Sequence, residues 1–154
     1  AIIRGKLEGI AARYVGGDLF PAPNDMKLNI EKLELADASF DVILCSHVLE
    51  HVDDAKALGE LFRVLRPGGV ALLLFPVIEG WSQTYENPAV KTDADRIEHF
   101  GQYDHVRYFG ADVRGRIRQA GFDLDEYTAV EPDVSRYGLL RGEKIFLARK
   151  PMQS

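Results

Sequence analysis

The sequence predicts an α/β fold built on a mostly parallel sheet. Two stretches, 40–45 (FDVILC) and 70–75 (VALLLF), are nearly continuous in apolar residues. This is typical of strands that are buried on both faces of a parallel sheet. The segment between them has the apolar spacing of an amphipathic helix. Strand, helix and strand therefore form one βαβ unit, whose crossover should be right-handed.

A helix and two short strands are predicted before this unit. Apolar residues recur at helical spacing over residues 3–10, which indicates a short amphipathic helix. Residues 13–17 are predicted to form a brief strand that ends at Gly16, Gly17 and Asp18. Apolar and polar residues alternate over residues 26–30, which favours a second short strand.

The helix of the βαβ unit has clear boundaries in the sequence. Asp53 or Asp54 can serve as its N-cap, and Pro67, Gly68 and Gly69 should end it. Its buried face is predicted from four residues at the spacing i, i+3, i+4 and i+7: Leu58, Leu61, Phe62 and Leu65.

The C-terminal half is predicted to complete the sheet. Residues 78–110 have no clear period and are long for a loop of a compact domain. A helix is predicted over 113–120, with Gly121 at its C′ position. Residues 123–130 and 143–148 should be the final strands, and we expect the C-terminal strand to run antiparallel.

Composition narrows the class of protein. The 154 residues are 46% hydrophobic, which is enough for the core of one domain spanning residues 1–154. The net charge of −5 argues against a nucleic-acid partner. The longest apolar run, 70–78, is far shorter than the ~20 residues that span a bilayer, so we expect no membrane partner. Cys45 is the only cysteine, and we expect a cytoplasmic protein.

The stretch SHVLEHVDD contains the pattern H-x-x-E-H, formed by His47, Glu50 and His51. In some metallopeptidases this pattern places two zinc ligands and a general base on one helix. A catalytic zinc also needs a third protein ligand. Here the pattern directly follows a buried strand, and the helix signals begin only at Asp53. We therefore expect these side chains to serve the turn, and we predict no metal site.

The longer pattern over residues 33–76 resembles the second half of a class I S-adenosylmethionine-dependent methyltransferase of the type 11 branch. Three motifs occur in the order and spacing of that family: D-x-S-F-D-V at 37–42, H-V-L-E-H-V at 47–52 and R-V-L-R-P-G-G at 63–69. Downstream, FGQYDHVRYFG and RQAGFDLD are similar to a subgroup of bacterial methyltransferases. The resemblance implies a Rossmann-like methyltransferase sheet and S-adenosylmethionine as cofactor.

The resemblance also implies where the cofactor binds, because ligands of open α/β sheets lie beyond the carboxyl ends of the strands. Asp18 matches the acid of the family that binds the ribose hydroxyls. Asn29 stands where the family usually has an Asp near the adenine, and His47 should border the methionine portion. For Asp18 and Asn29 a solvent-exposed turn residue is the alternative. The expected cofactor-binding residues are Asp18, Leu19, Asn29, Ile30, Ser46 and His47.

Methyl transfer from a sulfonium needs positioning more than covalent catalysis. A hydroxyl acceptor would also need a general base, for which histidine is suited by its pKa. His99 and His105 are the candidate catalytic residues, and His51 is less well placed. Ordinary hydrogen bonding is the alternative for each histidine. Arg107 would bind an acidic group of the substrate or a nearby carboxylate.

One part of the family pattern is missing. No glycine-rich G-x-G-x-G turn precedes Asp18, and neither does the strand that leads into it. That strand stands centrally in the family's sheet, and unpaired backbone there would be costly. Either the flanking strands pair directly, residues near Ala1 fill the gap, or a second copy lends a strand in a homo-oligomer.

The sequence therefore supports two main hypotheses of function. The first is a methyltransferase acting on a small-molecule or saccharide acceptor, with oxygen favoured over nitrogen or carbon. The second is a non-catalytic, truncated relative that serves as a binding or oligomerisation module. A zinc hydrolase is a third hypothesis, which stoichiometric zinc would revive.

Overall fold

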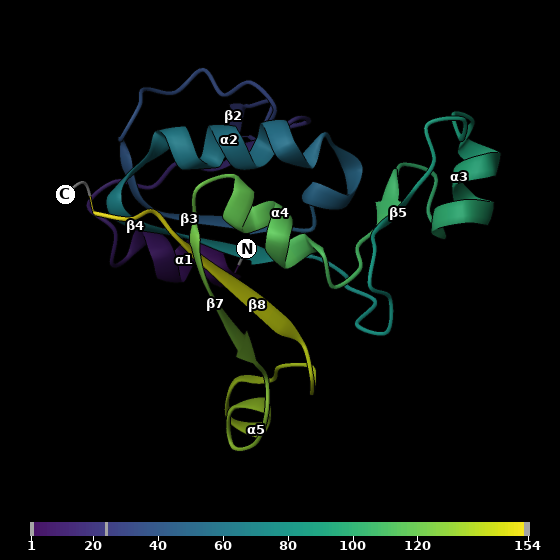
Figure 1. Cartoon of the computed structure of the whole chain (residues 1–154). Helices are drawn as coiled ribbons and strands as arrows, with labels where there is room; N and C mark the ends of the chain where they lie inside the picture. Colours follow the sequence, from purple (N-terminus) through teal and green to yellow (C-terminus); the bar gives the residue numbers. More distant parts are fainter. Residues whose placement is uncertain (1, 24, 153–154) are drawn as a thin grey trace.

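The computed structural model describes residues 2–23 and 25–152 (Figure 1). Ala1, near which a replacement strand was considered, lies outside these residues. None of the helices within the described ranges has the length and apolarity that a membrane crossing requires.

The N-terminal part forms a helix and a small sheet of its own. Helix α1 (Ile2–Glu8) confirms the predicted helix, although it stops two residues earlier than expected. Strands β1 (Gly17–Asp18) and β2 (Met26–Lys27) pair in parallel and form a separate two-stranded sheet. Each is only two residues long, because neither pairs with the main sheet and no further ladder extends it.

The main sheet has four strands in the order β3-β4-β8-β7. β3 and β4 are parallel, whereas β8 is antiparallel to both β4 and β7. Three strands thus run in one direction and the C-terminal strand runs against them, which confirms the predicted fold class. The strands are β3 (Phe40–Ser46), β4 (Leu65–Leu74), β7 (Asp123–Thr128) and β8 (Lys144–Arg149).

Strand β3 lies at one edge of this sheet, next to β4 only. The idea that the strand ending at Asp18 closes the gap by pairing directly with β3 is wrong, since β1 pairs with β2. The recruitment of N-terminal residues as a strand is also wrong for residues 2–8, which are helical. A strand lent by a second copy stays a prediction.

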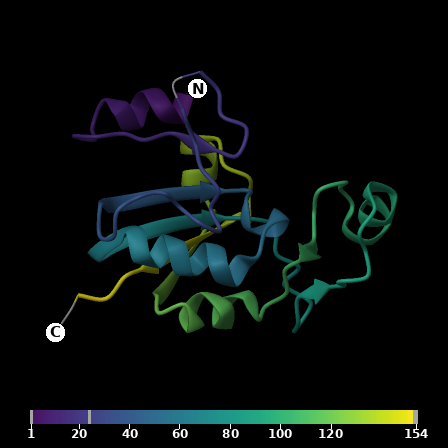
Figure 2. The ribbon, with the colours of Figure 1, turned by 90° about the horizontal axis from the view of Figure 1, so that it is seen from above.

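Two helices cover one face of the main sheet. Helices α2 (Asp54–Val64) and α4 (Val113–Gln119) lie on the same side, whereas α1 lies on the opposite side (Figure 2). Leu58, Leu61 and Ile117 are fully buried beneath them. On the opposite face Val42 and Leu44 of β3 are 55% and 42% exposed. The sheet is therefore well covered on one face only.

The boundary between α2 and β4 differs from the prediction. Asp53 caps α2 as expected, because its carboxylate accepts from the Lys56 amide. The helix ends at Val64, however, and β4 begins at Leu65 instead of residue 70. Leu65 already pairs with Phe40, and the register shifts before Val42. The Pro-Gly-Gly segment is thus an irregular part of the strand.

The segment predicted to lack a clear period forms an arm that extends away from the sheet (Figures 1 and 2). It contains a two-stranded antiparallel sheet and a helix, whose N-cap Thr92 accepts from the Asp95 amide. The arm and one further short helix near β8 were not predicted. These elements are β5 (Tyr85–Glu86), α3 (Asp93–Phe100), β6 (Arg107–Tyr108) and α5 (Asp133–Tyr137).

Candidate functional site

The chain leaves β3 through an unusual turn. His47, directly after the strand, has a φ of 54°. Positive φ is uncommon for residues with a β-carbon, and such conformations cluster at functional sites. The His47 amide donates to the carbonyl oxygen of Leu74 over 2.8 Å, which holds the turn against the end of β4. The 3-10 helix η1 (Leu49–His51) follows, so the H-x-x-E-H pattern lies on a turn, as predicted.

Glu50 is a buried carboxylate at the centre of this turn and is only 2% exposed. Its Oε1 lies 3.2 Å from Nδ1 of His47. Its Oε2 is buried and has no hydrogen-bond partner within residues 2–23 and 25–152. Burying a carboxylate is costly unless its oxygens are paired. Within the described part of the chain, no hydrogen bond offsets the burial of this oxygen.

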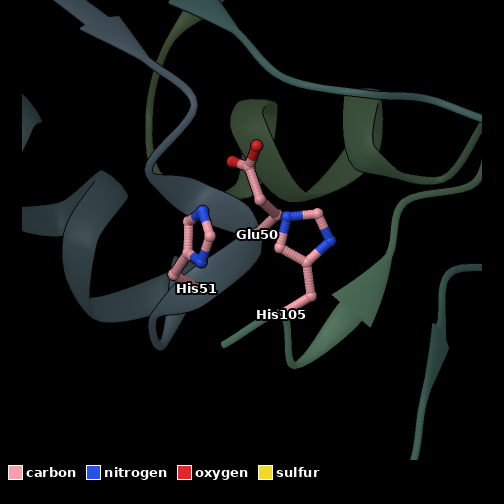
Figure 3. Close-up of side chains that lie close together, drawn as sticks. All are labelled: Glu50, His51 and His105. Atoms are coloured by element: carbon pink, nitrogen blue, oxygen red, sulfur yellow. The ribbon is translucent and has the colours of Figure 1, made fainter. Parts of the chain in front are cut away.

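Two histidines approach Glu50 from different parts of the chain (Figure 3). His51 belongs to η1, and His105 lies in the loop between α3 and β6. One potential ligand atom from each of the three side chains lies within 4.8 Å of the other two. The two imidazole rings meet edge to face, with their centroids 4.7 Å apart. From the sequence, His51 was ranked below His99 as a candidate catalytic residue. In the structure, His51 contacts His105.

Backbone carbonyls fix the tautomer of both rings. Nδ1 of His51 lies 3.2 Å from the carbonyl oxygen of Asp104, and Nδ1 of His105 lies 3.3 Å from that of Phe100. A carbonyl oxygen only accepts hydrogen bonds, so Nδ1 must be the protonated nitrogen in each ring. When the rings are neutral, each Nε2 therefore carries a free lone pair.

The Asp104 carboxylate adds negative charge beside His51, with Oδ2 3.4 Å from Nδ1. Burial opposes the ionisation of Asp104. A hydrogen bond from Gln102 and the nearby charge of His51 outweigh this effect and lower the pKa of the carboxyl group. Asp104 is thus ionised at neutral pH. It supports the Nδ1 donor of His51.

Arg107 holds the turn in place. It is buried, and its guanidinium donates to the carbonyl oxygens of Leu49 (2.9 Å) and Val52. It also pairs with Glu86 at 3.1 Å and with Asp54 at 3.5 Å. Of the two roles considered for Arg107, the structure favours the internal carboxylate over an acidic substrate. The arginine ties η1 to β6 and to the start of α2.

The predicted cofactor-binding residues fall into two groups. Asp18 ends β1 and Asn29 follows β2, and the Leu28 amide donates to the Asp18 carbonyl oxygen. Their side chains each accept from an amide two residues ahead, at 2.8 Å for Asp18 and 2.9 Å for Asn29. Leu19 is 49% exposed, whereas Ile30 packs partly against the core.

Ser46 and His47 lie at the end of β3 and form the second group. Within the described ranges, no hydrogen bond joins either residue to the first group. A cavity of about 180 Å³ opens beyond the carboxyl ends of β3 and β4. It is lined by His47, the residues after Leu74 and the loop before β8. His47 is the predicted site residue that reaches it.

The other predicted catalytic residue, His99, lies elsewhere. It is exposed on α3, and its Nδ1 lies 2.7 Å from the hydroxyl group of Tyr85. Phe100 and Tyr108 stand between it and His105 in a chain of aromatic contacts. The structure therefore does not bring His99 and His105 together. Glu50 and His51 are the members of the cluster that sequence reasoning set aside, although the H-x-x-E-H pattern contained both.

The chain is similar to known methyltransferases. Residues 8–73 match the family model described as a methyltransferase domain. The ubiquinone/menaquinone biosynthesis C-methyltransferase UbiE of Vibrio campbellii is 32% identical over 116 residues, which are 66% of this chain and 45% of that protein. The same enzyme of Proteus mirabilis is 32% identical over 117 residues, 67% of this chain and 47% of that protein. The chain thus spans less than half the length of these relatives.

Solved structures share the fold. An S-adenosylmethionine dependent methyltransferase from Mesorhizobium loti aligns with 97% of this chain and 85% of its own, with a TM-score of 0.63 and 17% identity. The 1,6-didemethyltoxoflavin-N1-methyltransferase of Burkholderia thailandensis, solved with bound 1,6-didemethyltoxoflavin and S-adenosylhomocysteine, aligns with 96% of this chain and 65% of its own, with a TM-score of 0.65 and 18% identity. The chain thus has the fold of class I S-adenosylmethionine-dependent methyltransferases, and its residues 8–73 match a methyltransferase-domain model.

Proposed function

We propose that this chain binds S-adenosylmethionine beyond the carboxyl ends of β1, β2 and β3 and takes part in methyl transfer to a small organic acceptor. The observation that carries the proposal is the turn after β3. It combines a positive φ at His47 with a buried carboxylate at Glu50, and His47 also lines the cavity beyond the ends of β3 and β4. Ligands of open α/β sheets bind at this position.

The residues present fit the cofactor in part. Asp18 is exposed at the end of β1, and the Phe20 amide engages only its Oδ1. Oδ2 is thus available to accept from a ribose hydroxyl. Asn29 Oδ1 already accepts from the Glu31 amide, so it has one lone pair left for an adenine amino group. His47 would border the sulfonium end, and bound S-adenosylmethionine would supply the activated methyl group.

The acceptor atom is a finer question. The oxygen preference expected from the sequence is not supported by the relatives, whose names specify carbon and nitrogen methylation. We propose an acceptor with an ionisable hydroxyl group on a conjugated ring. Removing its proton makes the ring carbon nucleophilic as well as the oxygen. A saccharide acceptor has no support among these relatives.

Two bases for that proton were predicted, His105 and His99. We favour His105, because its Nδ1 donates to the Phe100 carbonyl oxygen and Nε2 is left as a free base. His99 already engages Tyr85 on the exposed arm. Replacing each histidine by Gln should distinguish them. His105→Gln should lower turnover with little change in cofactor affinity, whereas His99→Gln should change neither.

Calorimetric titration with S-adenosylmethionine and S-adenosylhomocysteine tests cofactor binding. We expect micromolar binding, weakened by roughly 10- to 100-fold in Asp18→Asn, because each hydrogen bond to a charged group is worth about 1.5–3 kcal/mol. Asp41→Asn is the matched control, since Asp41 is an exposed aspartate of β3 that pairs with Arg66. Equal affinity of Asp18→Asn and wild type would refute the assignment of Asp18.

A non-catalytic binding or oligomerisation module is the second candidate. It is favoured by the edge position of β3 and by the exposure of Val42 and Leu44 on the less covered face. No heat with either ligand at millimolar concentration would support it against the methyltransferase. A second copy lending a strand would appear as a concentration-dependent dimer in sedimentation. For either function, we propose that the protein is located in the cytoplasm, in line with its single cysteine.

A further inference from the structure

We infer that Glu50, His51 and His105 form a binding site for a divalent transition-metal ion, with Zn²⁺ as the expected occupant. The sequence predicted no metal, because H-x-x-E-H lacked a third ligand and a regular helix. The fold brings His105 to the turn and supplies that ligand from outside the motif (Figure 3). Two histidines and one carboxylate are a known set of protein ligands for catalytic zinc.

The first argument is the state of the Glu50 carboxylate. Oε2 is buried and lacks a hydrogen-bond partner within the described part of the chain. Because Oε2 is buried, a negative charge on it without a partner would destabilise the folded protein. A bound cation would satisfy this oxygen. His47 engages only Oε1, so it does not meet the need.

The second argument is the orientation of the two rings. Histidines that bind metals usually donate their other ring N–H to a carbonyl or a carboxylate. Here both Nδ1 atoms have such partners, at 3.2 Å for His51 and 3.3 Å for His105. Asp104 adds a carboxylate 3.4 Å from Nδ1 of His51. The arrangement leaves both Nε2 lone pairs for an ion.

The third argument is distance. Zinc binds nitrogen and oxygen at about 2.1 Å, which in a tetrahedron separates neighbouring donors by about 3.4 Å. The three donor atoms lie within 4.8 Å of one another, so an inward movement of at most about 0.8 Å by each would complete the geometry. His51 and His105 are partly exposed, which gives an ion access from solvent and leaves an open coordination position.

Such a site would change the role of His105. The role as a base proposed above applies to His105 in the metal-free chain, because the Nε2 lone pair cannot bind an ion and accept a proton at the same time. The ion could then lower the pKa of an acceptor hydroxyl in its place. The metal proposal itself does not rest on the methyl-transfer proposal, because metal binding is measured without cofactor or acceptor.

The test uses the whole chain after treatment with a chelator and dialysis. Zn²⁺ is titrated against a chromophoric competitor, and Co²⁺ is titrated with visible absorption as the readout. We expect one equivalent of each, micromolar or tighter binding of Zn²⁺, and the intense bands of low-coordinate Co²⁺. Mg²⁺ should not compete, because it prefers oxygen ligands. Absence of one-to-one binding by the folded wild-type chain at 100 µM Zn²⁺ would overturn the proposal.

Variants identify the ligands. Glu50→Gln and His105→Asn should each weaken Zn²⁺ binding by about 100-fold or more, whereas His99→Asn should leave it unchanged. His99 is the matched control because it is a histidine outside the cluster, paired with Tyr85. Circular dichroism checks that each variant is folded. Binding that survives in both cluster variants, or that is lost in the His99 variant, would show that the ion binds elsewhere.

Discussion

Replacing Arg107 should destabilise the protein far more than replacing an exposed arginine. The guanidinium is buried, and it bridges the carbonyl oxygens of the η1 turn to the carboxylates of Asp54 and Glu86. In Arg107→Met the side-chain volume is largely kept. The two carbonyl oxygens lose their donor, and Arg116, at 3.2 Å, is the ion-pair partner that Asp54 keeps among the described residues.

The expected magnitude follows from these losses. Removing one partner of a buried ion pair costs about 3–5 kcal/mol. With a urea dependence of about 2 kcal/mol per molar, the midpoint of unfolding should fall by roughly 1.5–2.5 M. Arg66→Met is the matched control, because Arg66 pairs with Asp41 at the surface, where the two side chains are 49% and 74% exposed. Such a pair contributes about 0–1 kcal/mol.

Urea unfolding followed by circular dichroism measures both variants under the same conditions. Arg107→Lys provides an intermediate case, since it keeps the charge but not the planar fork of donors. If Arg107→Met lost no more stability than Arg66→Met, the buried network would not support the turn. The reasoning about the site's rigidity would then be wrong.

Three further predictions concern single groups. Burial raises the pKa of the Cys45 thiol to about 12, so Cys45 in the folded protein should resist alkylation at pH 8 and react only when denaturant is added. Burial opposes the ionisation of Glu86, but hydrogen bonds from two arginines outweigh it and lower the pKa of this carboxyl group from 4.5. The stability that the ionised Glu86 contributes should therefore be present above pH 4.5 and be lost as the pH falls further. In Glu86→Gln, the free energy of unfolding should depend less on pH in that range. Gly121 has a φ of 103°, and an added β-carbon would lie 2.9 Å from the Phe62 ring, so Gly121→Ala should lower the free energy of unfolding by at least about 1–2 kcal/mol. Gly115 lies in α4 with open space around it, so Gly115→Ala should raise the free energy of unfolding by up to about 1 kcal/mol. Thermal unfolding measures both variants.

The elements that depend on local pattern were predictable. The apolar runs predicted the strands β3 and β4, and the apolar stripe from Leu58 to Phe62 predicted α2. The expectation that residues 40–45 are buried on both faces is wrong, because β3 lies at the sheet edge and exposes Val42 and Leu44. The arm formed by α3, β5 and β6 was not predictable in this way. Its helix buries only Phe100, and its strands are two residues long, so the segment contains too few periodic positions to give a signal.

The same division applies to the candidate site. The H-x-x-E-H pattern marks the turn after β3, and the resemblance to a family suggests where Asp18 and His47 stand. No spacing in the sequence relates Glu50 to His105, because they come together only when β6 and η1 pack across the buried Arg107. The ranking of His99 above His51 as a catalytic residue stays a prediction.

The sequence by itself determined the α/β class and the βαβ unit, because these follow from the pattern of side chains along a strand or helix. The resemblance of residues 33–76 to a methyltransferase family indicated where a cofactor would bind. Only the tertiary structure decided which side chains share a site. It separated β1 and β2 from the main sheet, left β3 at an edge and brought His105 to a buried Glu50 with one unpaired oxygen. Contacts between distant segments depend on how whole elements pack, and local residue patterns do not encode that geometry.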